Sequence, residues 1–476
     1  MGIAPAAVEA RELRRGLNQT GGALNAASRN IAPKSGEVCP GETIHSGRRA
    51  LFSNIRLGTG CILLRGYTVT ALAALLTAIA TPASAAQSFP VFLEGVWPEA
   101  QALGVTRKTF DRAFRGVKPD YSLPDLIIKG RKRDDSAGQA EFTKSAMAYL
   151  SPKYLRRLAI QGRKFLKQHE RAIVNIEKTT GVDRKILVAI WGRETSYGRH
   201  RLRHDSIRVL VTQAYVGRRK DMFRKELLYA LKMLQDGIPR SKMRSSWAGA
   251  VGLTQFMPSE YYQHAADGDG DGRADIFNSV PDALASAARQ LANKGWVRDL
   301  RWGYEARLPK NGDCSLEGPS GARTIREWVA LGFERAGPKP FRPDEVVHEA
   351  YLMMPSGAYG PAFLATENFQ VIRRYNTSDL YALFVGNLAD RIAGGGDFYT
   401  PSSNIAQPRT RQVKEIQSRL IKRGYDLQKV DGKIGSNTRR QVGTYQKKNN
   451  LKIDCWPTQA VLKHLRATAS LSRNAQ

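Results

Sequence analysis

The stretch DRKILVAIWGRETSYG, residues 183–198, combines an apolar helix pattern with a carboxyl group. Its apolar residues recur at the spacing of one helix face: Ile186, Leu187, Ile190 and Trp191. Gly198 is typical of a residue that stops a helix, so the pattern predicts a buried helix that ends near Glu194. Burial against apolar side chains raises the pKa of a carboxyl group and lets it act as a general acid. A glutamate at a helix end is more often solvated or ion-paired, so catalysis needs support from other motifs.

A second motif follows about fifty residues later, SSWAGAVGLTQFMPSEYYQHA, residues 245–265. Its small residues allow the backbone to approach a neighbour closely, and Gln255, Phe256 and Pro258 stand beside them. Amide and hydroxyl groups next to an aromatic ring suit a sugar site, because sugars present hydroxyl groups and flat apolar faces. The alternative is a tight junction between helices.

A third motif resembles a calcium loop. Four aspartates and a glycine occupy positions 1, 3, 5, 6 and 9 of an EF-hand loop: Asp267, Asp269, Asp271, Gly272 and Asp275. The carbonyl of Arg273 falls at position 7, while Asn278 stands where a bidentate glutamate is expected. The pattern predicts a structural Ca²⁺ site, and the alternative is an Asp/Gly-rich turn that binds no metal.

Composition divides the chain into five segments. Residues 86–395 show successive helix patterns without the sustained alternation that a large sheet needs, which predicts an α-rich catalytic domain. Gly, Ser, Pro and Asn crowd into residues 396–410, as in a linker. Residues 411–468 predict three short helices, and residues 469–476 form a tail.

Residues 1–85 are interpreted as an N-terminal extension and signal peptide. The apolar stretch at 67–80 has the length of a signal-peptide core, and Ala83-Ser84-Ala85 follows it as a cleavage site. A buried core helix or a retained anchor are the alternatives. Export to the periplasm is expected, without a transmembrane anchor after cleavage and without a lipid anchor, because Cys61 precedes the apolar stretch.

The chain is strongly basic, with 74 Lys and Arg against 43 Asp and Glu and a net charge of +31. Such an excess favours an acidic partner. An exported protein meets few nucleic acids, so anionic lipids and the carboxylates of wall peptides are the expected partners. The cysteines after the signal, Cys314 and Cys455, could form a disulfide or remain two buried thiols.

Taken together, ETSYG, SWAGAVGLTQFMPSEYYQ and DGDGDGRADIFNSVPDALASAARQLANKGW resemble the lytic murein transglycosylase B family. The resemblance implies a lysozyme-like α-rich fold and non-hydrolytic cleavage of the β-1,4 bond between N-acetylmuramic acid and N-acetylglucosamine. Glu194 would protonate the glycosidic oxygen and then deprotonate the muramyl C6 hydroxyl, which closes a 1,6-anhydro ring. Glu260 is the rival acid within these motifs, and Asp205 and Glu226 are carboxylates whose positions the sequence leaves open.

The same resemblance implies further site residues. Those expected to contact substrate are Ser246, Gln255, Tyr375, Asn376, Tyr381, Arg218 and Arg219. The arginine pair would face wall-peptide carboxylates, and a solvated surface is the alternative for it. The family's loop is longer than an EF-hand, which makes Asp282 the expected last calcium ligand.

The C-terminal segment DGKIGSNTRRQVGTYQ, residues 431–446, resembles the type 1 peptidoglycan-binding domain family. The matching residues are Asp431, Gly432, Gly435, Thr438, Tyr445 and Gln446. The glycines suit left-handed turn positions, so much of the motif can be structural. The interpretation is therefore a mainly α, monomeric wall enzyme with a tethered three-helix murein-binding domain and no organic cofactor. A hydrolytic muramidase and a non-catalytic murein-binding protein are the alternatives.

Overall fold

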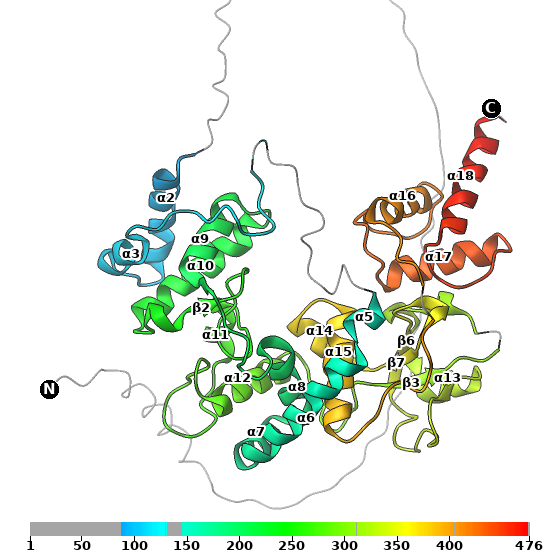
Figure 1. Ribbon diagram of the computed structural model, residues 1–476, viewed down its shortest axis with the longest axis horizontal. Coiled ribbons are helices and arrows are strands. Elements are labelled where there is room, and N and C mark those ends of the chain that lie inside the picture. The colour runs from blue at the N-terminus through cyan, green and yellow to red at the C-terminus, as the bar shows by residue number, and fades with distance from the viewer. Residues whose placement is uncertain (1–86, 129, 131–144, 311, 404, 475–476) are drawn as a thin grey trace, which may run out of the picture. The chain divides into compact units, whose positions relative to one another are not determined.

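The computed structural model describes residues 87–128, 130, 145–310, 312–403 and 405–474, which belong to one compact unit. The predicted extension and signal peptide lie outside the described residues. The described chain is mainly helical, as predicted (Figure 1). None of the helices in the described ranges is both long enough and apolar enough to cross a membrane.

Helices before and after the Glu194 motif form the first group of the fold. Its helices are α2 (Phe89–Ala102), α3 (Arg107–Phe114), α5 (Ala146–Tyr149), α6 (Pro152–Gln168), α7 (Glu170–Thr180), α8 (Arg184–Thr195), α9 (Ser206–Val216), α10 (Lys220–Gln235), η1 (Arg240–Lys242), α11 (Pro258–His264) and α12 (Val280–Asn293). Two short strands, β1 (His204–Asp205) and β2 (Arg244–Ser245), pair antiparallel within this group. Helices α14 (Glu367–Tyr375) and α15 (Asp379–Ile392) complete the same hydrophobic core.

The middle of helix α8 is buried on all of its sides. Asp183 caps its first turn by accepting a hydrogen bond from the Lys185 backbone N–H at 2.7 Å. Every residue from Ile186 to Gly192 is buried, and α6, α12 and α15 pack against the helix. A helix that is apolar on all faces needs such enclosing neighbours. The predicted stripe was therefore part of a more completely buried helix.

A five-stranded antiparallel sheet forms a second core that the sequence patterns did not predict. Its strands are β3 (Gly303–Arg307), β4 (Arg323–Thr324), β5 (Glu334–Arg335), β6 (Glu349–Met353) and β7 (Ala362–Ala365), in the order β4-β6-β7-β3-β5. Helix α13 (Ile325–Ala330) and the turns η2 (Cys314–Leu316), η3 (Pro319–Gly321) and η4 (Gly357–Tyr359) lie between the strands in sequence. Strands of two to five residues are too short for alternation to stand out.

The C-terminal segment forms the predicted three helices, α16 (Thr410–Ile421), α17 (Ser436–Lys448) and α18 (Gln459–Asn474). Their core includes Ile416, Val442, Tyr445 and Leu465. Gln417 holds the motif turn together, because its side-chain amide donates to Asp431 and Thr438 and accepts from the Gly432 backbone N–H. Gly432 has the left-handed conformation that was expected, with φ of 75°, whereas Gly435 has φ of −79° and does not.

The three-helix segment is held to the sheet by more than its linker. A disulfide joins Cys314 in η2 to Cys455, which decides between the two states left open for these cysteines. Arg439 on α17 forms an almost fully buried ion pair with Glu317, with Nε 2.9 Å from Oε2. Within the predicted linker, the backbone N–H groups of Tyr399 and Thr400 donate to Glu305 on β3. These contacts fix the segment to the sheet in addition to the linker.

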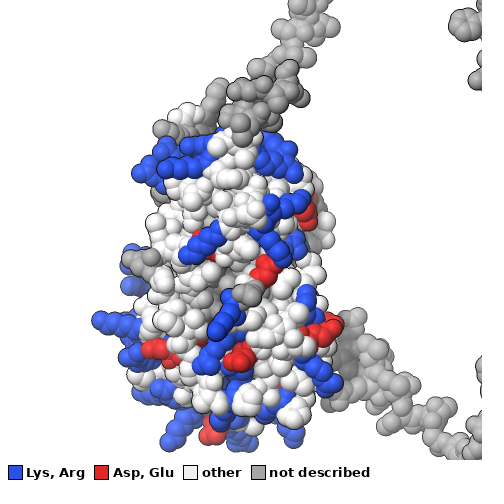
Figure 2. Space-filling model, turned by 90° about the vertical axis from the view of Figure 1, so that its right-hand side faces the viewer, with Lys and Arg blue, Asp and Glu red and all other residues white. Residues whose placement is uncertain are grey.

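The surface reflects the composition. On the face drawn in Figure 2, Lys and Arg side chains clearly outnumber Asp and Glu side chains. Many of the acidic groups are already paired with arginines or lysines in salt bridges, such as Glu415 with Arg466 and Asp313 with Lys447. The net positive charge of the chain therefore remains available to acidic partners.

Candidate active site

Glu194 lies in the last turn of α8 and is half-buried. Directly after it the chain turns back in three left-handed residues, with φ of 50° at Ser196, 62° at Tyr197 and 75° at Gly198. The Tyr197 ring then packs over Gly192, where an added Cβ would lie 2.6 Å from the tyrosine hydroxyl oxygen. The glycine thus lets the turn close onto the helix and presents Glu194 at the helix end.

Tyr381 makes the direct contact with this carboxyl group. It lies on α15, whose first turn is capped by the Ser378 hydroxyl, and its own hydroxyl donates to Glu194 Oε1 at 2.5 Å. Burial, and then the negative charge of Glu194, raise the pKa of Tyr381 well above its ordinary value. The phenol therefore stays protonated and remains a hydrogen-bond donor to the glutamate.

Tyr375 supports Tyr381 from the next helix. The two rings are stacked, with centroids 6.4 Å apart and an interplanar angle of 5°. The Tyr375 hydroxyl donates to the Thr254 carbonyl at 2.7 Å, which links α14 to the loop of the second motif. Burial is the main reason that the pKa of Tyr375 is raised, so this phenol is also neutral. The sequence motifs of Glu194, Thr254 and the two tyrosines are thus brought together.

Arg193 is a part of the site that the sequence analysis missed. Its Nε and Nη2 donate to the Tyr149 hydroxyl at 2.9 and 2.6 Å, and its guanidinium lies over the rings of Tyr149, Tyr381 and Phe384. A cation held on aromatic rings is fixed in direction. Its place next to Glu194 in the chain was visible, but the tyrosine that fixes it lies 44 residues away.

The loop residues with predicted substrate roles are placed on the strained turn of the second motif. Gln255 has a left-handed backbone, with φ of 58°, and its amide donates to the Gly252 carbonyl at 3.0 Å. Ser246 accepts a hydrogen bond from the Ala250 backbone N–H at its hydroxyl, and it is half-buried like Gln255. The Thr195 hydroxyl donates to Leu253, which ties this loop to the end of α8. Asn376 follows α14 directly as its C-cap.

Arg218 and Arg219 are brought together by a carboxylate that was not predicted. Asp125 accepts from Arg218 Nε at 2.8 Å, and Arg219 Nε lies 3.4 Å from its other oxygen. Arg219 also lies over the Phe223 ring at 5.1 Å. One negative charge is therefore shared between the two arginines, which reduces what the pair can offer to an acidic ligand.

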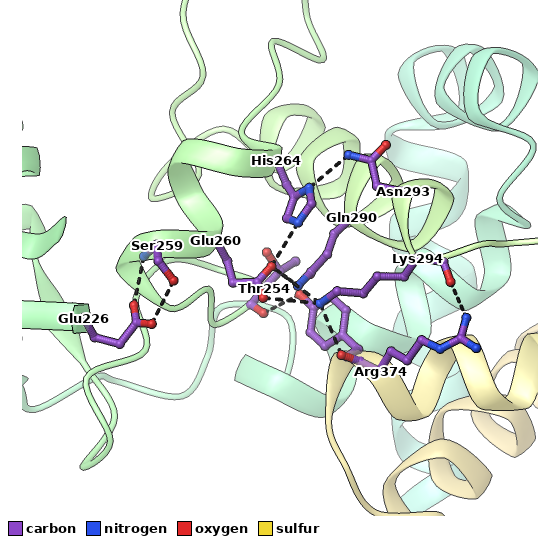
Figure 3. Close-up of polar contacts among 10 residues, drawn as sticks. Glu226, Thr254, Ser259, Glu260, His264, Gln290, Asn293, Lys294 and Arg374 are labelled. Atoms are coloured by element: carbon purple, nitrogen blue, oxygen red, sulfur yellow. Dashed lines mark hydrogen bonds and ion pairs between the residues drawn. The ribbon is translucent and has the colours of Figure 1, made fainter. Parts of the chain in front are cut away.

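The other candidate acids have different partners. Glu260 is surrounded by three polar side chains (Figure 3). Its carboxyl group accepts a hydrogen bond from Gln290 at 2.6 Å and lies 3.3 Å from Lys294 and 3.1 Å from His264. Both of its carboxyl oxygens are thus engaged by other side chains. The rival role of Glu260 as the acid is therefore not supported by its surroundings.

Two further carboxylates are used inside the fold. Glu226 on α10 is buried and accepts from the Ser259 backbone N–H and hydroxyl at 2.9 and 2.8 Å, which seats the start of α11 (Figure 3). Asp205 accepts two hydrogen bonds from Arg240, at 2.8 and 3.1 Å. Both carboxylates are therefore committed to contacts that hold the fold together.

The predicted calcium loop, residues 267–282, brings three of its expected ligands together. Carboxylate oxygens of Asp267, Asp269 and Asp271 lie within 4.8 Å of one another, all on exposed residues. Asp275 is paired with Lys242 at 3.0 Å, and the buried Asp282 accepts from the backbone N–H groups of Gly268 and Asp275 at 2.8 Å each. Asp282 thus joins the beginning of the loop to Asp275 through its two carboxylate oxygens. A hard cation that prefers oxygen fits the three gathered carboxylates.

Comparison with known proteins is consistent with these features. Residues 88–390 match the transglycosylase SLT domain family, and residues 409–465 match the putative peptidoglycan binding domain family. The membrane-bound lytic murein transglycosylase B of Escherichia coli (strain K12) is 32% identical over 232 residues, which are 48% of this chain and 62% of that protein. The match therefore spans less than two thirds of that relative.

Two solved structures are similar over more of their length. SltB3 from Pseudomonas aeruginosa, in complex with NAG-anhNAM-pentapeptide, has a TM-score of 0.71 and 39% identity over 80% of this chain and 100% of its own. Soluble lytic transglycosylase SltB1 from the same organism has a TM-score of 0.51 and 28% identity over 63% of this chain and 98% of its own. These similarities confirm the predicted lysozyme-like α-rich fold with a peptidoglycan-binding domain.

Proposed function

Because the chain belongs to the transglycosylase SLT domain family, we propose that it is a lytic murein transglycosylase with Glu194 as its acid and base. The substrate is the glycan strand of peptidoglycan, cut between N-acetylmuramic acid and N-acetylglucosamine. The observation that carries the proposal is a half-buried Glu194 held by the neutral hydroxyl of Tyr381. The relative SltB3 was solved with an anhydromuramyl product, which supports the same reaction here.

The reaction needs one carboxyl group. Glu194 donates its proton to the glycosidic oxygen while the bond from that oxygen to C1 of the muramyl sugar breaks. The carboxylate then takes the proton of the muramyl C6 hydroxyl, whose oxygen bonds to C1 and closes the anhydro ring. A hydrolase would need a second carboxylate to bind water or form an intermediate. Asp205, Glu226 and Glu260 are engaged elsewhere, which favours the non-hydrolytic route.

The surrounding side chains hold this group and the sugar. Tyr381 orients the Glu194 carboxyl, and Tyr375 orients Tyr381 through the stacked rings and its bond to Thr254. Gln255, Ser246 and Asn376 are proposed to bind the sugar amides and hydroxyl groups. Arg218 and Arg219, neutralised in part by Asp125, are proposed to border the groove.

The remaining assignments follow from the same function. Residues 86–395 would form the catalytic domain, 396–410 the linker and 411–468 the peptidoglycan-binding domain, preceded by a signal peptide that directs the chain to the periplasm. Asp267, Asp269 and Asp271, with the Arg273 carbonyl and after rearrangement Asp275 and Asp282, would hold Ca²⁺, whose charge would stabilise the loop.

Mass spectrometry of the products released from purified murein sacculi tests the proposal. The protein should release anhydromuramyl ends, which are one water lighter than reducing ends, and Glu194→Gln should release none. Glu260→Gln is the matched control, because its carboxylate has other partners, and it should still form anhydro ends. Reducing ends would identify a hydrolytic muramidase, and equal release by the Glu194→Gln variant would exclude this acid.

A further inference from the structure

A cavity of about 520 Å³ opens beside Thr195, the residue that follows Glu194. The segments after α8, around β2 and at the end of the calcium loop meet there. Its basic side chains are His200, Arg201, Lys242 and Arg244. None of the described residues that line it is acidic, so this space, here called the basic cavity, has the electrostatic character of an anion site.

The four basic groups are not equally available. Lys242 is paired with Asp275 at 3.0 Å, and Arg244 donates to the Arg203 carbonyl. The side chains of Arg201 and His200 form no hydrogen bond or ion pair with any residue in the described ranges. Arg201 is exposed, so among the described residues its guanidinium is the unpaired arginine of the basic cavity.

A guanidinium binds a carboxylate through two parallel hydrogen bonds, a geometry that few other side chains provide. The peptide stem of murein carries free carboxylates and is attached to the muramyl sugar, the sugar on which the reaction takes place. Thr195 and Leu253 line the cavity and also connect the end of α8 to the second-motif loop. The basic cavity therefore adjoins the end of the helix that carries Glu194, the side from which we expect a stem attached at the reacting sugar to be bound.

We propose that the basic cavity binds a carboxylate of the peptide stem, with Arg201 as the residue that selects peptide-bearing strands. The inference rests on the proposed function and adds a specificity site to it. Arg218 and Arg219 were the sequence-based choice for this role, but they share Asp125, whereas Arg201 has no competing anion among the described residues. The unshared charge identifies the stronger carboxylate site.

Binding to the inactive Glu194→Gln protein separates the two proposals. The probes are GlcNAc-MurNAc-tetrapeptide, the same compound with its peptide carboxylates amidated, and GlcNAc-MurNAc without peptide, measured by calorimetry. Adding Arg201→Gln should weaken binding of the free-acid tetrapeptide compound by about tenfold, as expected for loss of a hydrogen bond to a charged group. Binding of the amidated and peptide-free compounds should be unchanged.

Arg171→Gln is the matched control, because Arg171 is an exposed arginine on α7 away from the cavity lining, and it should bind all three compounds normally. Calorimetry with inorganic phosphate alone should show no binding that depends on Arg201; phosphate binding that Arg201→Gln abolishes would identify a phosphate site and overturn the proposal. Equal loss of affinity for all three, or no loss, would overturn it too. Cleavage of peptide-stripped glycan strands by the unmodified protein tests the proposed function without involving Arg201.

Discussion

Tyr381 and Glu194 are 187 residues apart in the chain, and a hydrogen bond of 2.5 Å joins the tyrosine hydroxyl to carboxyl oxygen Oε1. The bond connects two helices that pack directly on each other, α8 and α15. Because the phenol is buried and neutral, it donates a hydrogen bond when Glu194 is a carboxylate. When Glu194 is protonated, the phenol oxygen can also accept a hydrogen bond from it. The direction of the carboxyl group is thereby set from outside its own helix.

Tyr381→Phe should lower kcat on murein by about tenfold to a hundredfold, with a smaller effect on KM, since a hydrogen bond to a charged group contributes about 1.5–3 kcal/mol. The phenyl ring keeps the stacking on Tyr375, so the thermal unfolding midpoint should change little. Steady-state release of anhydromuropeptides measures the effect. An unchanged kcat would mean that the tyrosine does not orient the acid.

Asp205→Asn should destabilise the protein at pH 7, and this effect should shrink as the pH falls below the ordinary carboxyl pKa of 3.8. Burial alone would raise the pKa of Asp205, but Arg240 and the Arg208 backbone N–H hold it below the ordinary value of 3.8. A depressed carboxyl pKa stabilises the fold above the unfolded value, and that contribution is lost as the pH falls through the folded value. Urea unfolding should show a difference of about 1–2 kcal/mol at pH 7 that disappears at the acid end. A constant difference across pH would contradict the assignment.

The double variant Cys314→Ser/Cys455→Ser should lower the free energy of unfolding by about 2–5 kcal/mol, because the bridge closes a long loop of the unfolded chain. Dithiothreitol should produce a similar loss in the unmodified protein and no further loss in the variant. Thermal unfolding followed by circular dichroism provides the measurement. A reductant effect that persists in the double variant would place its cause in other thiols.

Calcium should raise the thermal unfolding midpoint of the unmodified protein. A ligand present at about 100 times its Kd adds about 2.7 kcal/mol to the stability of the state that binds it. Asp267→Asn removes one of the three gathered carboxylates and should abolish most of this increase. Asp221→Asn, an exposed aspartate on α10, is the control and should keep the increase. A calcium effect that is equal in both variants would place the ion elsewhere.

Local patterns predicted more of this molecule than long-range contacts did. The helix that carries Glu194, the three C-terminal helices and the gathered aspartates follow from residues close together in sequence. Tyr381 and Tyr375 were predicted through a family resemblance, because nothing in their own segment indicates that they face a glutamate on another helix. Tyr149, which holds Arg193, had neither kind of signal.

The sheet and its connection to the C-terminal helices were missed for a related reason. Strands such as β4 and β5 contain two residues each, so no periodicity can be detected in them. Arg439 and Glu317 are 122 residues apart, and each taken alone looks like a solvated surface residue. Their burial depends on the packing of α17 against η2, which sequence spacing does not express.

The Cys314–Cys455 bridge also affects how a proteolytic cut of the chain would be detected. The two cysteines are separated by 141 positions, and the peptide segment between them includes the linker and the motif of the peptidoglycan-binding domain. A single protease cut inside that segment leaves both fragments covalently joined through sulfur. Such a nicked molecule would migrate as one band on a non-reducing gel and separate into two only after reduction, and its intact mass would differ from that of the uncut chain by only one water.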